Sequence, residues 1–99
     1  MNVLILEAAV TPARLTELGA LAWPQWKDPV GVTSQHYDAE EKSYFLAGEA
    51  LLGLPGSEPV RVAKGDLITI PAGECRWEVL SLVRRHYRSD ALSPACCIV

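Results

Sequence analysis

The chain has 99 residues, 49% of them hydrophobic and 21% charged, with a formal net charge of −3 at pH 7. These values predict one folded domain and exclude a disordered chain. The acidic balance argues against a general nucleic-acid-binding protein. No apolar run approaches the roughly 20 residues that span a bilayer, and the start through Glu7 lacks the basic residues of a signal peptide. We expect a cytoplasmic protein with no nucleic-acid or membrane partner.

Cysteine content agrees with that location. Three cysteines, an odd number, do not form a disulfide framework, and reduced thiols are typical of the cytosol. Two of them, Cys96 and Cys97, lie near the C-terminus and suggest no site. Four late arginines are interpreted as solvated strand positions or partners for carboxylates, with a phosphate patch as the alternative; they are Arg76, Arg84, Arg85 and Arg88.

The N-terminal quarter predicts one strand and one helix. Residues 2–9 form a short apolar run. Thr11 followed by Pro12 predicts a helix start, with the threonine as N-cap and the proline in the first turn. The helix should end before Trp23–Pro24, because the residue before a proline avoids the helical region. Its apolar stripe, which we expect to pack as core, consists of Leu15, Leu18, Leu21 and Ala22.

From Val30 onward, short β-rich runs are separated by turn residues, which is typical of a sandwich or barrel. The turn signals include Leu54–Ser57 and Ala63–Asp66. We predict a closed antiparallel β-structure, since an open small sheet would leave edges that aggregate. The expected strands are near 30–37, 42–47, 49–54, 58–63, 66–70, 75–80 and 82–88. The whole chain, 1–99, is predicted as one domain with its core at about 23–88, an N-terminal strand and helix in 1–22, and a tail at 89–99.

Two spaced motifs carry a family resemblance. Glu41 is followed by six residues and then Gly48, and His36 precedes Glu41 by five positions. Further on, Gly65 is followed by five residues and then by Pro71-x-Gly73. This pattern resembles the two-part signature of the cupins, which implies a double-stranded β-helix, or jelly-roll barrel, with its site inside.

Cupin chemistry usually depends on a metal held by three histidines and one glutamate. Here Ser34 stands at the first histidine position, and Cys75 or Arg76 at the last one. We therefore expect no metal or other cofactor. A metal, if bound, would use His36, Glu41 and Cys75, a donor set that zinc accepts.

Finer details over residues 11–88 resemble the small single-domain, RmlC-like cupins grouped with the ureidoglycine aminohydrolase cupin domain. The resemblance implies a fold and a pocket more than an activity. The segments that carry it are Trp23–Trp26, Tyr37–Asp38, Glu41-x-x-Tyr44, Gly65–Asp66, Pro71-x-Gly73, Cys75–Leu80 and Arg85–Tyr87.

Three residues are candidates for catalysis. At the cupin position Glu41 would point into the barrel, where burial raises a carboxyl pKa and suits acid–base work; the alternative is a structural ion pair with an inward arginine or tyrosine. His86 is either its acid–base partner or a structural histidine. Cys75 is either a thiol nucleophile activated by a nearby cation or a small apolar core residue.

Candidate ligand-binding residues are mostly aromatic, as in many small-molecule sites. If Arg76 and Glu78 face inward, Trp77 must face outward, because successive strand residues alternate. The predicted ligand-binding set is Trp26, His36, Tyr37, Tyr44, Arg76 and Trp77.

Three functions remain open. The first is a small-molecule-binding cupin, with acid–base catalysis on a small polar metabolite such as a ureide, an amino-acid derivative or a sugar. The second is a non-catalytic ligand-binding or sensing module that dimerises. The third is a metal-dependent cupin enzyme that uses His36 and Glu41. We expect a homodimer in each case, because pairing protects apolar strand edges.

Overall fold

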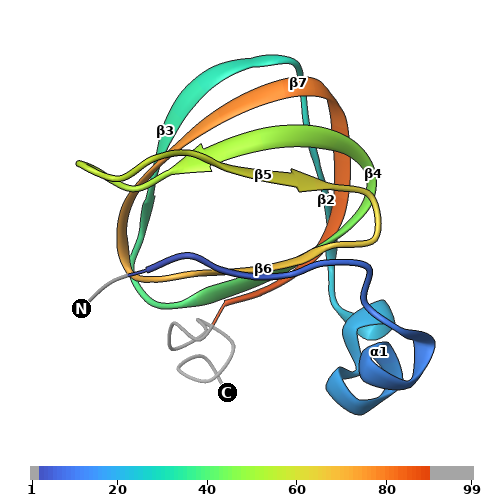
Figure 1. The fold of residues 1–99 in the computed structure, drawn as a ribbon. Helices are drawn as coiled ribbons and strands as arrows, with labels where there is room; N and C mark the ends of the chain where they lie inside the picture. The colour runs from blue at the N-terminus through green and yellow to red at the C-terminus, as the bar shows by residue number, and fades with distance from the viewer. Residues whose placement is uncertain (1–2, 90–99) are drawn as a thin grey trace, which may run out of the picture.

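The computed structural model describes residues 3–89 and is built around two long, bent strands (Figure 1). The predicted all-β class with one short helix is confirmed; of the predicted tail, only Ser89 lies among the described residues. The elements are β1 (Ile5–Glu7), α1 (Pro12–Leu18), the 3₁₀ helix η1 (Ala20–Ala22), β2 (Gln25–Asp28), β3 (Gly31–Tyr37), β4 (Glu41–Gly53), β5 (Val60–Ala63), β6 (Leu67–Ile70) and β7 (Gly73–Ser89).

The long strands β4 and β7 are shared by both halves of the barrel. They pair antiparallel from Glu41 opposite Ser89 to Gly53 opposite Arg76. The other edge of β4 pairs first with β6 and then with β5, while the other edge of β7 pairs with β3 and then with β2. Strand β1 pairs with β6. The sheet curls around one interior, as the view in Figure 1 shows.

Both long strands were predicted as two separate strands, and that division was wrong. The register shifts three times on β4 between Phe45 and Ala50, so the strand bends without ending. Gly48 lies at this bend with φ 89°, and a Cβ there would lie 2.2 Å from the carbonyl oxygen of Leu82. Glycine thus permits the close approach that lets β4 continue.

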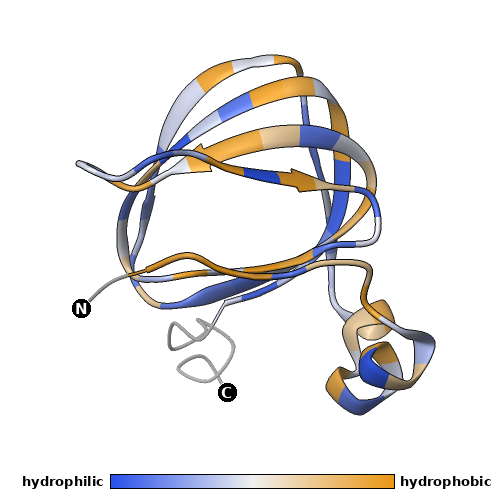
Figure 2. Ribbon diagram, viewed as in Figure 1, coloured by the Kyte–Doolittle hydropathy of each residue, from blue (hydrophilic) through white to orange (hydrophobic). Residues whose placement is uncertain are grey.

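The core fills the interior through strand alternation. On β7, Cys75, Trp77 and Val79 are buried, whereas Arg76 is exposed and Glu78 is half-buried. Arg76 and Glu78 therefore face outward and Trp77 faces inward, the reverse of the orientation considered from the sequence. Figure 2 shows hydrophobic and hydrophilic residues alternating along β4 and β7. The core cluster is Tyr37, Phe45, Ala50, Leu52, Val62, Ile68, Ile70, Cys75, Trp77, Val79 and Val83.

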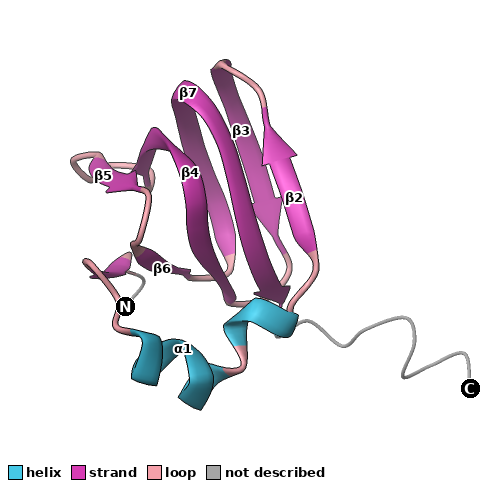
Figure 3. Ribbon diagram, turned by 90° about the vertical axis from the view of Figure 1, so that its right-hand side faces the viewer, coloured by secondary structure: helices cyan, strands magenta, loops and turns pink. Residues whose placement is uncertain are grey.

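The helical segment lies at one end of the barrel (Figure 3). Thr11 caps α1 by accepting a hydrogen bond from the Arg14 amide at 3.2 Å, as the sequence predicts. The helix ends earlier than expected, because Gly19 takes a left-handed conformation with φ 68°. Leu15 is buried, but Leu21 is 60% exposed, so the expected apolar stripe stops at the end of α1. Within residues 3–89, no helix has the length and apolar character needed to cross a membrane.

Strand β2 was not predicted. Its residues Gln25–Asp28 pair with β7 from His86 to Val83. Three of its four residues are exposed, and only Asp28 is buried. This strand supplies one wall of the candidate site.

Candidate functional site

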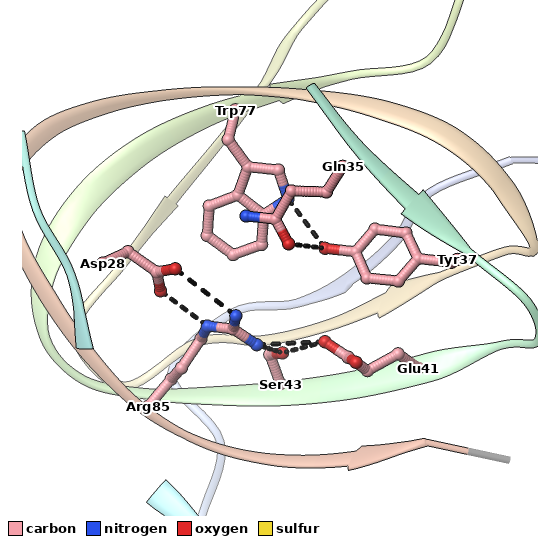
Figure 4. Close-up of polar contacts among 7 residues, drawn as sticks. All are labelled: Asp28, Gln35, Tyr37, Glu41, Ser43, Trp77 and Arg85. Atoms are coloured by element: carbon pink, nitrogen blue, oxygen red, sulfur yellow. Dashed lines mark hydrogen bonds and ion pairs between the residues drawn. The ribbon is translucent and has the colours of Figure 1, made fainter. Parts of the chain in front are cut away.

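A buried arginine lies at the centre of the candidate site. The side chain of Arg85, on β7, is 5% exposed. Its Nε donates to Asp28 Oδ2 at 2.7 Å, and its Nη1 donates to Glu41 Oε2 at 3.0 Å and to Ser43 Oγ at 2.8 Å (Figure 4). Burial by itself would lower the pKa of Arg85. The hydrogen bond to Asp28 and the negative charges of Asp28 and Glu41 outweigh burial, so the pKa is raised. The guanidinium is therefore a permanent cation.

The sheet register explains why two carboxylates reach one guanidinium. Arg85 lies opposite Trp26 on β2 and opposite Phe45 on β4. Asp28 is two positions from Trp26, and Ser43 is two positions from Phe45, so each shares the inward face of its strand. Glu41 is a further two positions along β4 on the same face. The carboxylates thus approach Arg85 from the strands on both sides of β7.

Two aromatic side chains pack against the guanidinium of Arg85. The Arg85 Cζ lies 4.8 Å from the ring centroid of Trp77 and 5.7 Å from that of Tyr87, which is cation–π geometry. Trp77 in turn stacks on Phe45 with ring centroids 6.0 Å apart. These rings and the hydrogen bonds to Asp28, Glu41 and Ser43 together hold the guanidinium in place.

A hydrogen-bond relay leads from Trp77 to the barrel opening. Trp77 Nε1 donates to the Tyr37 hydroxyl at 2.9 Å, and that hydroxyl donates to Gln35 Oε1 at 3.0 Å. Burial, followed by the charge of Glu41, raises the pKa of Tyr37, so its proton stays available to Gln35. The amide of Gln35 is thereby oriented, with its oxygen toward Tyr37 and its NH₂ group left for another acceptor.

Gln35 and Arg85 border an open pocket of about 330 Å³ at the barrel mouth. Trp26 is 57% exposed and forms its outer wall. The inner wall combines a charged pair, an amide and a second aromatic ring. The pocket is lined by Trp26, Gln35, Glu41, Arg85 and Tyr87.

The Glu41 side chain is 12% exposed, and one of its two carboxylate oxygens accepts the hydrogen bonds made by residues 3–89. Its Oε2 accepts from Arg85 and, at 3.4 Å, from Ser43. Burial raises the pKa of this carboxyl, while the Arg85 charge and the two hydrogen bonds act in the opposite direction. No residue among 3–89 donates a hydrogen bond to Oε1, which belongs to a pocket-lining side chain. The group can accept hydrogen bonds or exchange a proton at that atom.

His86 lies apart from Glu41. Neighbouring strand residues alternate, so His86 faces away from the interior that Arg85 occupies. Its Nδ1 donates to the backbone oxygen of Trp23 at 2.7 Å, which ties β7 to the segment after η1. Tyr44 is the cross-strand partner of His86 and also lies outside the pocket. The structure does not bring the candidate acid–base pair together.

Cys75 is enclosed in the apolar core. Its thiol is fully buried, and burial raises its pKa to about 11. A thiol with a raised pKa is mostly protonated at neutral pH, which opposes a role as nucleophile. Trp77, predicted to contact ligand, is likewise fully buried and reaches the site only through Arg85 and Tyr37.

His36 and Arg76 face outward. His36 is exposed and lies 3.2 Å from Glu74 and 3.5 Å from Asp38. Arg76 lies 3.7 Å from Glu78 and borders a separate outer groove beside the β4–β5 turn. Of the predicted ligand-binding residues, only Trp26 lines the barrel-mouth pocket.

The three residues considered for a metal do not form a donor set. In the β3–β7 register, Gln35 lies opposite Cys75, and His36 lies opposite Glu74 on the outer face. Glu41 is bound to a guanidinium, whose charge repels a divalent cation. No cluster of three or more potential metal-ligating side chains occurs within residues 3–89. These residues do not fit the metal site of the cupin signature.

Several residues in and around the pocket were not identified from the sequence as site residues. Arg85 was considered as a solvated residue or a carboxylate partner, with a phosphate patch as the alternative, and Gln35, Ser43 and Asp28 were not considered. One signal was present: Arg85 follows buried apolar residues at odd-numbered positions of β7, which are Cys75, Trp77, Val79 and Val83. An arginine in that series indicates a buried cation, which needs buried carboxylates.

Comparisons with known proteins agree with this architecture. A family model described as the EutQ-like cupin domain matches residues 15–87. A crystal structure of a DUF861-family protein from Thermotoga maritima is 36% identical, with a TM-score of 0.82, and the match covers 88% of this chain and 99% of that chain. No curated protein matches the chain significantly. Neither comparison tests the closer likeness to the ureidoglycine aminohydrolase domain. The chain belongs to the EutQ-like cupin domain family.

Proposed function

We propose that this cupin binds a small polar molecule at its barrel mouth. The observation that supports the proposal is the pocket of about 330 Å³ with an ion-paired, rigid base. Small-molecule sites typically combine apolar walls with a few oriented polar groups. Here the walls are Trp26 and Tyr87, and the oriented polar groups are Gln35 and Glu41.

The polar groups have complementary roles. The NH₂ group of Gln35 donates, because the amide oxygen already accepts from Tyr37. Glu41 Oε1 accepts when ionised and can donate when protonated. A small metabolite that carries both hydrogen-bond donors and acceptors fits this pair.

A ligand screen tests the proposal. Small polar metabolites, including ureides, amino-acid derivatives and sugars, are added to the protein while the melting temperature is recorded. A ligand at about 100 times its Kd stabilises the native state by about 2.7 kcal/mol. For a true ligand, Trp26→Ala should reduce the stabilisation, while Val32→Ala, an exposed position on β3, should not. Stabilisation that survives Trp26→Ala unchanged would place the ligand elsewhere.

Acid–base catalysis by Glu41 is a second candidate function. Its support is the raised pKa of a half-buried carboxyl that lines the pocket. Once a ligand is found, Glu41→Gln should leave binding detectable and abolish conversion of that ligand. Unchanged conversion in the variant would reject this role and leave a non-catalytic binding or sensing module.

The homodimer stays part of the proposal. Exposed apolar side chains on the outer face of β3 and β7 support it, among them Val32, Leu80 and Leu82. Light scattering after size exclusion should give twice the chain mass, and Leu82→Glu should shift the protein toward monomer. A cytoplasmic location is also proposed, supported by the unpaired thiol of Cys75.

A further inference from the structure

The charged groups at the barrel mouth form an alternating row. Asp28 contacts one side of Arg85, and Glu41 contacts the other. Two carboxylates against one guanidinium leave one negative charge when Glu41 is ionised. Asp28 is buried and does not line this pocket, whereas Glu41 does, so Glu41 is the carboxylate that a ligand in the pocket would meet.

Arg85 is poorly placed to bind an anion. Its Nε and Nη2 are directed to Asp28, at 2.7 and 3.5 Å, and its Nη1 donates to both Glu41 and Ser43. Four of the five guanidinium N–H groups therefore have partners inside the protein. An anionic ligand would find at most one N–H group of Arg85 and would meet the negative charge of Glu41 beside it.

Glu41 can still accept hydrogen bonds from a ligand. Its Oε1 has no hydrogen-bond donor among residues 3–89. Asp28, Arg85 and Glu41 alternate in charge, and a positively charged group bound to this oxygen would continue the alternation. Burial disfavours the ionised form of the Glu41 carboxyl. A positive charge at Oε1 would offset that penalty, because an opposite charge favours ionisation.

The walls suit the same ligand. Trp26 on β2 is largely exposed at the pocket edge, and Tyr87, two positions from Arg85 on β7, lines the same pocket. Tryptophan and tyrosine faces attract organic cations and also pack against an apolar body. A ligand with a charged head and a small apolar part uses both features.

We infer that the ligand of this pocket is a small organic cation, a protonated amine whose ammonium group binds Glu41 Oε1 and whose apolar part packs on Trp26. The inference rests on the proposed function, because it assigns a chemical class to the same pocket.

Three probes of matched shape separate charge from shape: benzylamine, benzyl alcohol and benzoate. Each is titrated at pH 7, where benzylamine is a cation, and binding is followed by amide chemical shifts of the pocket residues. The amine should bind about tenfold more tightly than the alcohol, which corresponds to about 1.4 kcal/mol, and benzoate should bind most weakly.

Matched variants identify the source of the preference. Glu41→Gln keeps the hydrogen bond to Arg85 and removes the charge, so the amine should lose its advantage over the alcohol. Glu74→Gln removes an exposed carboxylate from the outer face of β7 and should leave the preference unchanged. Trp26→Ala, at a largely exposed position, should weaken the amine and the alcohol alike.

The outcomes distinguish the inference from the proposed function. Equal binding of amine and alcohol, or tightest binding of benzoate, overturns the cation assignment and leaves a small-molecule pocket in place. An amine preference that persists in Glu41→Gln also overturns it. No shift in the pocket residues with any probe, together with no stabilising ligand in the metabolite screen, overturns both.

Discussion

The Nε of Arg85 lies 2.7 Å from Oδ2 of Asp28, and both side chains are almost fully buried, at 5% and 7% exposure. The pair joins β7 to β2, a strand on which Asp28 is the one buried residue. Glu41 and Ser43 extend the contact to β4. One guanidinium thus cross-links three strands and forms the base of the pocket.

Arg85→Met should be strongly destabilising. Removing one member of a buried ion pair leaves the other charges uncompensated and typically costs about 3–5 kcal/mol. Urea denaturation at pH 7 measures the loss. Arg84→Met is the matched control: this neighbour is exposed and makes one contact at 3.4 Å, so its effect should stay within about 0.5 kcal/mol.

A combined variant tests the cause of that loss. If uncompensated charge is responsible, adding Asp28→Asn and Glu41→Gln to Arg85→Met should recover a large part of the free energy of unfolding. If recovery is absent, the arginine acts through its packing on Trp77 instead.

Glu41→Gln should alter the pH dependence of stability. Burial raises the folded-state pKa of Glu41, so its ionisation destabilises the native state as pH rises from about 4.5 through that value. The free energy of unfolding of wild type should therefore fall relative to the variant over this range. The facing groups Asp28, Arg85 and Tyr37 are common to both proteins. Denaturation at a series of pH values checks this; a wild-type free energy of unfolding that rises relative to that of the variant over this range contradicts it.

The barrel could be predicted because its signals are local. Turn residues and apolar alternation mark most strands, and Pro71-x-Gly73 belongs to a signature with a fixed place in the fold. The long strands could not be separated from pairs of short strands in the same way. Gly48 looks like a strand end in sequence, and only the close approach of Leu82 shows that the chain bends and continues.

The polar part of the site depends on tertiary pairing. Glu41 could be predicted from its motif, and an inward arginine was an open alternative for its partner. Asp28 lies in the run Gln25–Asp28, whose single apolar residue, Trp26, gives no alternation that predicts a strand. It is buried because β2 pairs with β7 beside Arg85. The burial of such a residue cannot be predicted from its own sequence neighbours, because it depends on a charged partner that is distant in the chain.

Gly48→Ala should destabilise the barrel. The added Cβ would meet the Leu82 backbone at 2.2 Å, and φ 89° is unfavourable for alanine, so we expect a loss above about 2 kcal/mol. Gly56→Ala is the control, since Gly56 also has a positive φ but has open space around it. Its cost should be about 1–2 kcal/mol. Equal losses in chemical denaturation would mean that the close approach does not contribute.

Cys75 should be unreactive in the folded protein. Its thiol is fully buried with a pKa raised to about 11. In a chain carrying Cys96→Ser and Cys97→Ser, a thiol-specific reagent should label Cys75 only as fast as the protein unfolds. Cys75→Ser should cost about 1–3 kcal/mol, because a hydroxyl replaces a thiol in the core. Rapid labelling of the native protein would restore the thiol as a candidate nucleophile.

Protein purified without chelator should contain no near-stoichiometric transition metal. The physical reason is that the three candidate metal ligands lie apart. His36 faces outward beside Glu74, and Cys75 is enclosed in the apolar core. The carboxylate of Glu41 forms an ion pair with Arg85. Elemental analysis of wild type and His36→Ala checks this, with equal, low metal content expected in both. Metal that is present in wild type and disappears in His36→Ala would mean that β3 adopts a register in which His36 turns inward. Such a register would move Gln35 out of the pocket, so the same result would also remove the hydrogen-bond relay from Trp77 to the barrel mouth.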